Sequence, residues 1–274
     1  MIQDIQPKIF SNAFSTKQPT EGDTVLVYSR NTILCQRRED TLHYPSLGQL
    51  DVLPQDCTFL FAIDNQDFFL LRKEGIAFPS GFAFENIAIF RTSVPQYLCF
   101  AGFIGYQLYN WYNDTRFCGR CGKPLTPSLK ERMMQCDSCG NTIYPKISPG
   151  VIVAITHGDK LLMTKYAGRE YTNYALVAGF TEVGETLEET VTREVMEEVG
   201  LKVKRVTYYK SQPWAFSSSL LCGFFAEVEG GTDITLETEE LASAEWFQRE
   251  EIPMRPDNIS LTREMMMAFK FGER

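Results

Sequence analysis

Residues 179–201 constrain the fold of this chain more than any other segment, because they specify both ends of a helix and the chemistry along it. Thr186 followed by Glu189 forms a capping-box pattern, so a helix is predicted to begin at about Leu187. Gly200 predicts its end, since glycine readily adopts the left-handed conformation that follows a helix. A short amphipathic helix is therefore expected between these two signals.

The predicted helix carries an apolar stripe and, beside it, a cluster of carboxylates. The apolar positions recur every four residues at Leu187, Val191, Val195 and Val199. Glu194, Glu197 and Glu198 are spaced so that their side chains project together. Three anions within one turn repel each other, and a hard divalent cation such as Mg²⁺ or Mn²⁺ removes that repulsion and prefers oxygen ligands. A charged, solvated helix face is the alternative that the cluster alone leaves open.

Four of the eight cysteines form a second pattern. They follow the spacing C-x2-C-x14-C-x2-C and comprise Cys118, Cys121, Cys136 and Cys139. This is the spacing of a four-cysteine zinc site, and Gly119, Gly122 and Gly140 are expected to permit the tight turns that aim two thiolates at one metal. Two disulfides are the alternative, but nothing in the sequence indicates secretion. Because four thiolates leave no open position, the predicted Zn²⁺, one per chain, is structural.

Length, composition and charge limit the classes of protein to which this chain can belong. With 274 residues, of which 44% are hydrophobic, the chain can bury sizeable cores. The net charge of −8 and the lack of a helix-turn-helix or strongly basic domain predict no DNA binding, although residues 115–146 hold six basic against two acidic residues. No apolar run reaches eighteen residues, and the N-terminal sequence MIQDIQPKIF lacks a signal-peptide pattern. The sequence therefore predicts a cytoplasmic location and no membrane partner.

The order of apolar segments predicts an α+β fold in three parts. Before residue 115, the runs TVLVY, FLFAI and FFLLR are typical of strands, and a helical pattern extends from Pro95 to Tyr112. After residue 147, PGVIVAIT, KLLMTKY, VTYYKSQPW and LLCGFFAEVE predict further strands, with a terminal helix near 259–270. No GxGxxG or GxxxxGK[ST] motif is present to bind phosphates. The predicted parts are an N-terminal α+β domain (1–115), the cysteine segment (116–146) and a C-terminal domain (147–274).

The glycines and acids of the first segment read Gly179-x5-Glu185-x7-Arg193-Glu194-x2-Glu197-Glu198-x-Gly200, which resembles the Nudix box at every defined position. The cysteine segment just before it and the sequence SQPWAFSSS at 211–219 are similar to the NADH pyrophosphatase subfamily, whose bacterial members also remove NAD caps from RNA. The subfamily signature is SQPWPFPxS, so Ala215 and Ser217 stand where prolines are expected. The resemblance extends from about Arg116 to the end of the chain. It implies a zinc ribbon at 116–146 and a Nudix α/β/α sandwich at 147–274.

The resemblance also implies an activity, which is metal-dependent hydrolysis of the pyrophosphate of NAD(H) to nicotinamide mononucleotide and AMP, together with removal of NAD caps from RNA. More than one Mg²⁺ or Mn²⁺ ion per site is expected. The implied catalytic residues are Glu185, Arg193, Glu194, Glu197 and Glu198, with Arg193 orienting carboxylates rather than touching substrate. The implied divalent ligands are the carboxylates of Glu194, Glu198 and Glu240, with Glu239 in reserve, and the carbonyl of Ala178. The implied substrate contacts are Gln212, Pro213, Trp214, Ala215, Phe216, Ser217, Ser218, Ser219, Phe180, Glu131 and Tyr144.

Aromatic residues suggest how a base would be held and how two chains would meet. Pro213 and the neighbouring serines predict a loop, and an aromatic side chain on it, such as Trp214, can stack on a flat base; a core position is the alternative. The resemblance implies a homodimer with composite sites. Residues 90–112 offer apolar surface for it through Phe100, Phe103, Tyr106, Tyr109 and Trp111, unless these fill the N-terminal core.

Two other functions remain open at this point. One is another Nudix hydrolase, acting on ADP-ribose, nucleoside diphosphate sugars or dinucleoside polyphosphates. The other is a ligand sensor in which the box has decayed, which the intact acids at positions 185, 194, 197 and 198 argue against.

Overall fold

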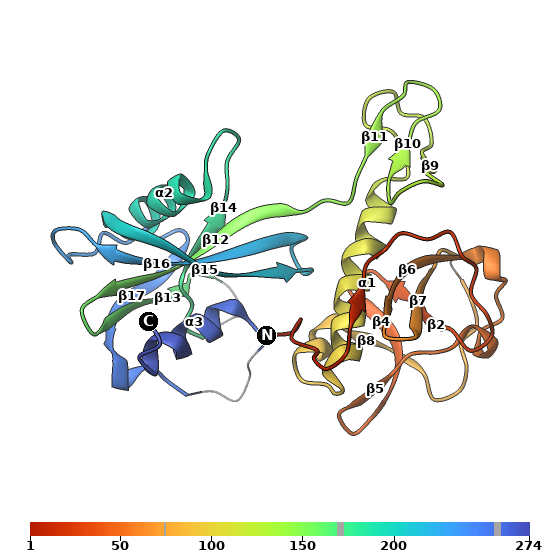
Figure 1. The fold of residues 1–274 in the computed structure, drawn as a ribbon, viewed down its shortest axis with the longest axis horizontal. Helices are drawn as coiled ribbons and strands as arrows, with labels where there is room; N and C mark the ends of the chain where they lie inside the picture. Colours follow the sequence, from red (N-terminus) through yellow and green to blue (C-terminus); the bar gives the residue numbers. More distant parts are fainter. Residues whose placement is uncertain (74, 169–172, 255–258) are drawn as a thin grey trace. The chain divides into compact units, whose positions relative to one another are not determined.

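The computed structural model describes residues 1–73, 75–168, 173–254 and 259–274. They form two compact units, one made by Ile2–Lys146 and the other by Ile147–Arg274 together with Met1 (Figure 1). Within the described ranges, no helix combines the length and the apolar character needed to cross a bilayer. The division into three domains stays a prediction, since the cysteine segment belongs to the first compact unit.

Two four-stranded sheets form the part of the first unit that precedes the cysteine segment. The first sheet has the order β1-β6-β7-β2, built from β1 (Phe10–Ser11), β6 (Cys57–Ile63), β7 (Gln66–Leu71) and β2 (Thr24–Leu26). The second has the order β3-β4-β5 with β8 paired to β4, built from β3 (Tyr28–Ser29), β4 (Thr32–Arg38), β5 (Thr41–His43) and β8 (Ala83–Asn86). Short 3-10 helices connect them at Leu47–Gln49, Pro54–Asp56 and Ile87–Arg91. The strands expected from three apolar runs are thus confirmed.

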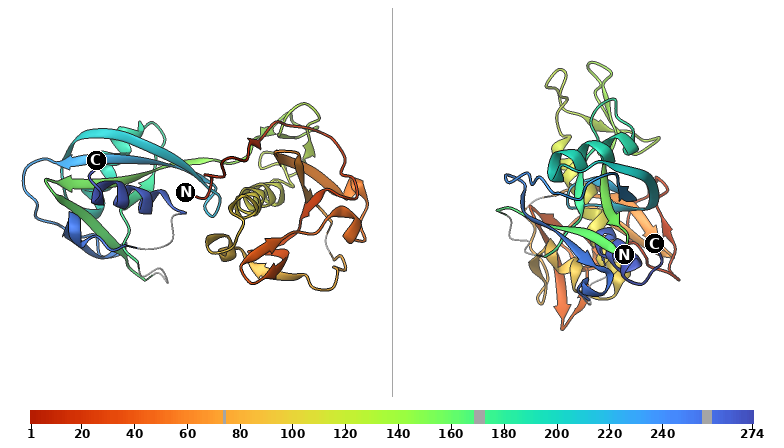
Figure 2. Two further views of the ribbon diagram at one scale, coloured as in Figure 1. Left: turned by 60° about the horizontal axis from the view of Figure 1, so that its bottom comes forward. Right: turned by 90° about the vertical axis from the view of Figure 1, so that its left-hand side faces the viewer.

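The predicted long helix is α1 (Gln96–Asp114), which runs alongside the two sheets of this unit (Figures 1 and 2). Its aromatic side chains are mostly core: Phe100, Phe103 and Trp111 are at most 5% exposed. They cannot offer the apolar docking surface that the sequence suggested, and this expectation is wrong because the sheets of the same unit already cover them. Tyr106 and Tyr109 are partly buried.

A small three-stranded sheet ends the first unit. Its strands, in the order β11-β10-β9, are β9 (Thr126–Pro127), β10 (Met134–Gln135) and β11 (Thr142–Ile143). Arg132 joins this segment to the rest of the unit, because its guanidinium donates to Asn12 Oδ1 at 2.6 Å and to the carbonyl of Leu60.

The second unit is built on a six-stranded mixed sheet. The order is β15-β16-β12-β13-β17, with β14 also paired to β12. The strands are β12 (Ser148–His157), β13 (Lys160–Tyr166), β14 (Val177–Phe180), β15 (Val203–Trp214), β16 (Ser219–Val228) and β17 (Leu241–Gln248). The β12–β16 pair is parallel and the other pairs are antiparallel. One further 3-10 helix spans Arg249–Glu251.

One helix covers each face of this sheet (Figure 1). On one face, α2 (Leu187–Val199) packs its fully buried Val191, Val195 and Val199 against β12 and β16. On the other, α3 (Leu261–Lys270) buries Met265 and Phe269 in a separate core cluster. Two apolar cores on opposite faces of one sheet make an α/β/α sandwich, as expected.

The ends of α2 lie where the sequence places them. Thr186 Oγ1 accepts the backbone N–H of Glu189 at 3.2 Å, and a carboxylate oxygen of Glu189 accepts the backbone N–H of Thr186 at 2.8 Å. Gly200 follows the last turn with φ 68°. The capping box and the left-handed C-terminal glycine are therefore confirmed.

The strand predicted from VTYYKSQPW is confirmed through Trp214, and the loop predicted around Pro213 begins only after Trp214. Pro213 and Trp214 belong to β15 and pair with Leu220 and Ser219 of β16. The connection between the strands is only the four residues 215–218. Proline is tolerated here because β15 is an edge strand of the sheet.

Candidate functional site

The carboxylates of α2 divide between a buried and an exposed side of the helix. Glu198 is 3% exposed and Glu194 is 9% exposed, although both are charged residue types. Glu197 is exposed. A solvated helix face would not bury two of three carboxylates, because burial of a charge is costly unless it is compensated. The cluster is therefore a built site rather than a surface pattern.

Arg193 organises these carboxylates. Its Nε and Nη2 donate to the two carboxylate oxygens of Glu185 at 2.6 and 2.9 Å. Its Nη1 donates to Glu194 Oε1 at 2.8 Å and to Glu197 Oε2 at 3.0 Å. One guanidinium thus links three acids, which agrees with the orienting role expected for Arg193.

The charges of this network shift the pKa values of its members. Hydrogen bonds from Arg193 are the main cause that lowers the pKa of Glu185 to about 2. Burial raises the pKa of Glu194 and outweighs the opposing effect of Arg193, with smaller contributions from the charges of Glu197 and Glu240. The charge of Glu240, from the turn before β17, thus acts on Glu194.

Strand β14 forms the wall opposite these acids. The backbone N–H of Ala178 donates to Glu198 Oε1 at 3.4 Å. The next residue, Gly179, leaves space for the carboxylate of Glu194, because a Cβ at this position would overlap that carboxylate. Buried carboxylate oxygens beside strand backbone are the donor set that hard divalent cations prefer. Glu194 and Glu198 are therefore of the type that fits a divalent ion, while the set completed by Glu240 and the Ala178 carbonyl stays a prediction.

Replacing Gly179 by alanine is expected to impair this site without unfolding the unit. The new methyl group would displace the Glu194 carboxylate, so the concentration of Mn²⁺ or Mg²⁺ needed for half-maximal activity should rise at least about tenfold. Titration of activity against metal concentration measures this. Gly184→Ala is a control in the turn that follows β14, since open space surrounds Gly184, although its φ of 97° will cost some stability. An unchanged metal requirement in Gly179→Ala would contradict the placement of Glu194.

The aromatic candidates gather at one end of the sheet. Phe180, the last residue of β14, is 51% exposed, and its carbonyl accepts Arg193 Nη2 at 2.9 Å. It pairs with Gly150 of β12, which pairs in turn with Leu221, two residues after Ser219. The β15–β16 turn therefore lies at the Phe180 end of the sheet. There Trp214 and Phe216 are partly exposed and meet edge to face, with ring centroids 5.3 Å apart.

Gln212 serves the fold rather than a ligand. It is fully buried, its amide donates to the carbonyl of Ile259 at 2.7 Å, and its oxygen accepts the backbone N–H of Leu261 at 2.7 Å. These bonds fix the first turn of α3, so we leave Gln212 out of the proposed substrate contacts. Ala215 and Ser219 are also buried, and Ser219 Oγ lies 2.7 Å from Ser217 Oγ. Pro213 and Ser218 are partly exposed.

The four cysteines of the first unit converge on one point. Their sulfur atoms all lie within 4.8 Å of one another. Cys118 and Cys139 are 3.6 Å apart, and Cys121 and Cys136 are 3.5 Å apart. A tetrahedral zinc with Zn–S bonds of about 2.3 Å separates its sulfurs by roughly 3.8 Å, whereas a disulfide requires about 2.05 Å. The geometry fits a four-cysteine zinc site and not two disulfides.

Two matching turns present these sulfurs. In the first, Gly122 N–H donates to the carbonyl of Cys118 at 2.8 Å; in the second, Gly140 N–H donates to the carbonyl of Cys136 at 2.9 Å. Both glycines have positive φ, 73° and 71°, as the sequence predicts. Gly119 does not adopt a positive φ, so its expected role in the turn is wrong.

Backbone donors in the same turns favour the thiolate form of two of the four cysteines, Cys118 and Cys136. The backbone N–H of Arg120 is the main cause that lowers the pKa of Cys118, to about 6. The backbone N–H of Cys139 likewise lowers the pKa of Cys136. Since zinc binds thiolate rather than thiol, these backbone donors favour the metal-binding form.

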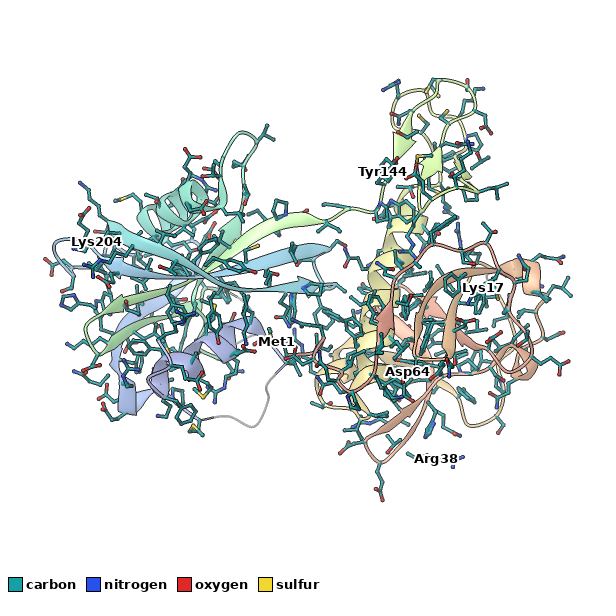
Figure 3. All side chains as sticks on the ribbon, viewed as in Figure 1. Met1, Lys17, Arg38, Asp64, Tyr144 and Lys204 are labelled. Atoms are coloured by element: carbon teal, nitrogen blue, oxygen red, sulfur yellow. The ribbon has the colours of Figure 1, made fainter. Side chains whose placement is uncertain are left out.

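Glu131 and Tyr144 lie together on the zinc ribbon, where Figure 3 labels Tyr144. The tyrosine hydroxyl donates to Glu131 Oε1 at 3.1 Å, and Tyr144 is 53% exposed. An exposed pair of this kind is accessible to a ligand.

Two positioning residues were not anticipated from the sequence. Thr190 is fully buried in α2, and its Oγ1 lies 3.0 Å from both Glu185 Oε2 and the carbonyl of Thr186, so its one hydroxyl proton serves either acceptor. Asn141 donates through Nδ2 to Cys118 Sγ at 3.7 Å. Thr190 stands one turn after the capping Thr186, and Asn141 directly follows the second cysteine turn, but neither position signals a role by its residue type alone.

Comparison with known proteins agrees with both sites. Residues 113–144 match the model of the NADH pyrophosphatase zinc ribbon domain, and residues 146–269 match the model of the NUDIX domain. The NAD-capped RNA hydrolase NudC of Salmonella schwarzengrund (strain CVM19633) is 42% identical over 162 residues, or 59% of this chain and 63% of the relative. The protein of the same name from Citrobacter koseri is 41% identical over the same shares. The match thus spans less than two thirds of the length of these relatives.

A crystal structure of a NUDIX hydrolase from Nitrosomonas europaea is also similar, with 23% identity, a TM-score of 0.49, and coverage of 57% of this chain and 90% of that one. The buried acids under β14 fall within the matched NUDIX region, and the sulfur cluster falls within the matched ribbon. Residues 113–144 of the chain therefore belong to the NADH pyrophosphatase zinc ribbon domains, and residues 146–269 belong to the NUDIX domains.

Proposed function

We propose that the chain hydrolyses the pyrophosphate of NAD(H) to nicotinamide mononucleotide and AMP, and that it removes NAD caps from RNA by the same reaction. The buried carboxylate pair of α2, held beside the backbone of Ala178, is the observation that carries the proposal. The zinc ribbon in the same chain and the relatives named NAD-capped RNA hydrolase support the choice of substrate. The expected location is cytoplasmic, with no DNA and no membrane as partners.

The chemistry requires positioning more than covalent catalysis. Mg²⁺ or Mn²⁺ bound at the carboxylates would neutralise the pyrophosphate and lower the pKa of the attacking water. Glu194 and Glu198 supply the oxygens, and Glu240 adds a third carboxylate from the turn before β17. Arg193 and Glu185 keep Glu194 in place. Phe180, half exposed beside this network, offers a surface against which a nicotinamide or adenine ring can stack.

Hydrolysis of a different nucleoside diphosphate derivative, such as ADP-ribose or a dinucleoside polyphosphate, is the second candidate, because the carboxylate site recognises pyrophosphate rather than a base. Initial rates with NADH, ADP-ribose and diadenosine tetraphosphate, each in Mg²⁺ and in Mn²⁺, separate the two. Our proposal expects the highest kcat/KM for NADH. A higher value for ADP-ribose or the polyphosphate would favour the second candidate. If none of these substrates is hydrolysed, a ligand sensor is the remaining candidate function.

We further propose a homodimer in which Trp214 closes over the metal site of the partner and stacks on the substrate. The proposal derives from the subfamily resemblance, and the partial exposure of Trp214 beside Phe216 supports it. Trp214→Ala is expected to weaken the binding of NADH by roughly the 1–3 kcal/mol typical of base stacking, which is seen as a higher KM. The metal requirement should stay unchanged. Tyr208→Ala is the matched control, since Tyr208 is 52% exposed on the same strand. Equal KM values for the two variants would show that Trp214 does not contact the substrate.

Mixing chains tests whether the site is shared. A heterodimer of Trp214→Ala and Glu198→Gln chains contains one site with both native residues if the two come from different chains. Activity should then recover on mixing, whereas each variant alone stays impaired. A monomer by light scattering, or no recovery on mixing, would contradict the composite site.

A further inference from the structure

The carboxylate of Glu185 is surrounded by donors of the chain itself. Its Oε1 accepts Arg193 Nε at 2.6 Å, and its Oε2 accepts Arg193 Nη2 at 2.9 Å and the backbone N–H of Glu182 at 3.0 Å. Thr190 Oγ1, 3.0 Å from Oε2, is in position to be the fourth donor, and a carboxylate offers about four lone-pair sites. Glu185 therefore ties the connection between β14 and α2 to the helix.

The single hydroxyl proton of Thr190 has two acceptors within reach. The carbonyl of Thr186 lies 3.0 Å from Oγ1, but it already accepts the backbone N–H of Thr190 at 3.0 Å. Glu185 is the charged acceptor, because its donors lower its pKa to about 2. A hydrogen bond to an ionised acceptor is roughly twice as strong as a bond between neutral groups. The carboxylate of Glu185 is therefore the favoured acceptor of this proton.

Arg193 passes the position of Glu185 on to the acidic site. The same guanidinium donates through Nη1 to Glu194 Oε1 at 2.8 Å and through Nη2 to the carbonyl of Phe180 at 2.9 Å. Because a guanidinium is planar and rigid, a shift of Glu185 also moves the two donors that face Glu194 and Phe180. Thr190 thus acts on a buried carboxylate of α2 through only two intervening side chains.

We propose that Thr190 is a positioning residue for the divalent cation: its hydroxyl donates to Glu185 and, through Arg193, holds Glu194 where the ion binds. The alternative is an ordinary helical threonine, whose hydroxyl bonds only to the carbonyl one turn earlier. The proposal rests on the metal site proposed above, but not on which nucleotide is hydrolysed there.

Replacing Thr190 by valine tests the proposal, because valine keeps the shape and removes the hydroxyl. The new methyl group would stand about 3.0 Å from Glu185 Oε2, closer than the roughly 3.5 Å at which non-bonded carbon atoms pack. The affinity of the full chain for Mn²⁺, measured without substrate by electron paramagnetic resonance of the unbound ion, should fall at least about threefold. This is less than the ~10–100-fold typical of a residue that contacts a metal ligand directly, since Thr190 acts through two others.

Thr190→Ser and Thr192→Val are the matched controls. Serine restores the hydroxyl, so Thr190→Ser should bind Mn²⁺ within about twofold of wild type. Thr192 is exposed on the same helix, and its Oγ1 donates to the carbonyl of Glu188 at 3.1 Å, so Thr192→Val removes an ordinary helical hydroxyl. Its Mn²⁺ affinity should also stay within about twofold. Equal affinities of Thr190→Val and Thr192→Val, or a serine variant as weak as the valine variant, would overturn the proposal.

Melting temperatures show whether the variants remain folded. If Thr190→Val does not fold, Thr190→Ala takes its place, since alanine removes the hydroxyl without placing a methyl group against Glu185. The same loss of Mn²⁺ affinity is expected of it.

A double-mutant cycle separates the route through Glu185 from an effect on the helix backbone. Glu185→Gln should itself weaken Mn²⁺, because Arg193 loses its charged partner. Adding Thr190→Val to Glu185→Gln should then change the affinity by less than about 1.5-fold, since the two residues act as one unit. An equal effect of Thr190→Val in both backgrounds would contradict the proposed route.

The same titrations distinguish failure of this proposal from failure of the proposed hydrolysis. No saturable Mn²⁺ binding by the wild-type chain would refute the metal site and, with it, the role of Thr190. Mn²⁺ binding that depends on the Thr190 hydroxyl, in a chain that does not hydrolyse NADH, would support this role and count against the proposed activity alone.

Discussion

Replacing Glu198 by glutamine is expected to lower kcat for NADH by ~10²-fold or more, as is usual when a catalytic metal ligand is lost. Glu198 is 3% exposed, and glutamine keeps its shape while removing the anion. The fold should therefore survive, because α2 is held by its apolar stripe and its caps rather than by this charge. Steady-state kinetics with NADH in saturating Mn²⁺, together with a melting curve, measure both effects.

Glu188→Gln is the control for this substitution. Glu188 is exposed in the first turn of the same helix, and only its backbone carbonyl takes part in a described hydrogen bond, from Thr192. Its kcat should stay within about twofold of wild type. If Glu198→Gln keeps its kcat within about threefold of wild type, Glu198 is not a metal ligand.

Replacing Cys136 by serine is expected to remove the zinc and to destabilise the ribbon. Metal binding and local folding are coupled in such small sheets, since three two-residue strands joined by two pairings are too few to hold the segment. Zinc content should fall well below one per chain, and the first melting transition should move to lower temperature. Activity should fall only as a consequence of this loosening.

Cys57→Ser separates loss of zinc from loss of a buried thiol. Cys57 is buried in the first unit but lies outside the sulfur cluster. This variant should lose some stability and keep one zinc per chain by metal analysis. Freshly purified wild-type protein with much less than one zinc per chain would refute the ribbon assignment altogether.

Features that depend on neighbouring residues in the sequence could be predicted well. The caps of α2 and the two cysteine turns each involve groups within about five residues, so residue type and spacing specify them. The acidic cluster was also predicted from its spacing. Its division into buried Glu194 and Glu198 and exposed Glu197 depends on β14 lying against the helix, which only the folded chain shows.

Features that depend on long-range pairing could not be predicted. The strand through Trp214 was predicted from VTYYKSQPW, but the sequence does not indicate that Gln212 is drawn into the core to bind the carbonyl of Ile259, 47 residues away, at the start of α3. Tertiary contacts override local propensity at such positions. For the same reason the aromatic side chains of α1 suggested a dimer surface, while Phe100, Phe103 and Trp111 are covered by sheets built from distant segments.

Analysis of the products shows directly whether the chain cleaves the pyrophosphate of NAD(H). The full chain is incubated side by side with NADH and with NAD-capped RNA in Mg²⁺ and in Mn²⁺, and the products are separated by chromatography. We expect equal amounts of reduced nicotinamide mononucleotide and AMP from NADH, and a 5′-monophosphate RNA with nicotinamide mononucleotide from the capped RNA. Release of free nicotinamide, or failure to cleave either pyrophosphate while another nucleoside diphosphate derivative is hydrolysed, would contradict it.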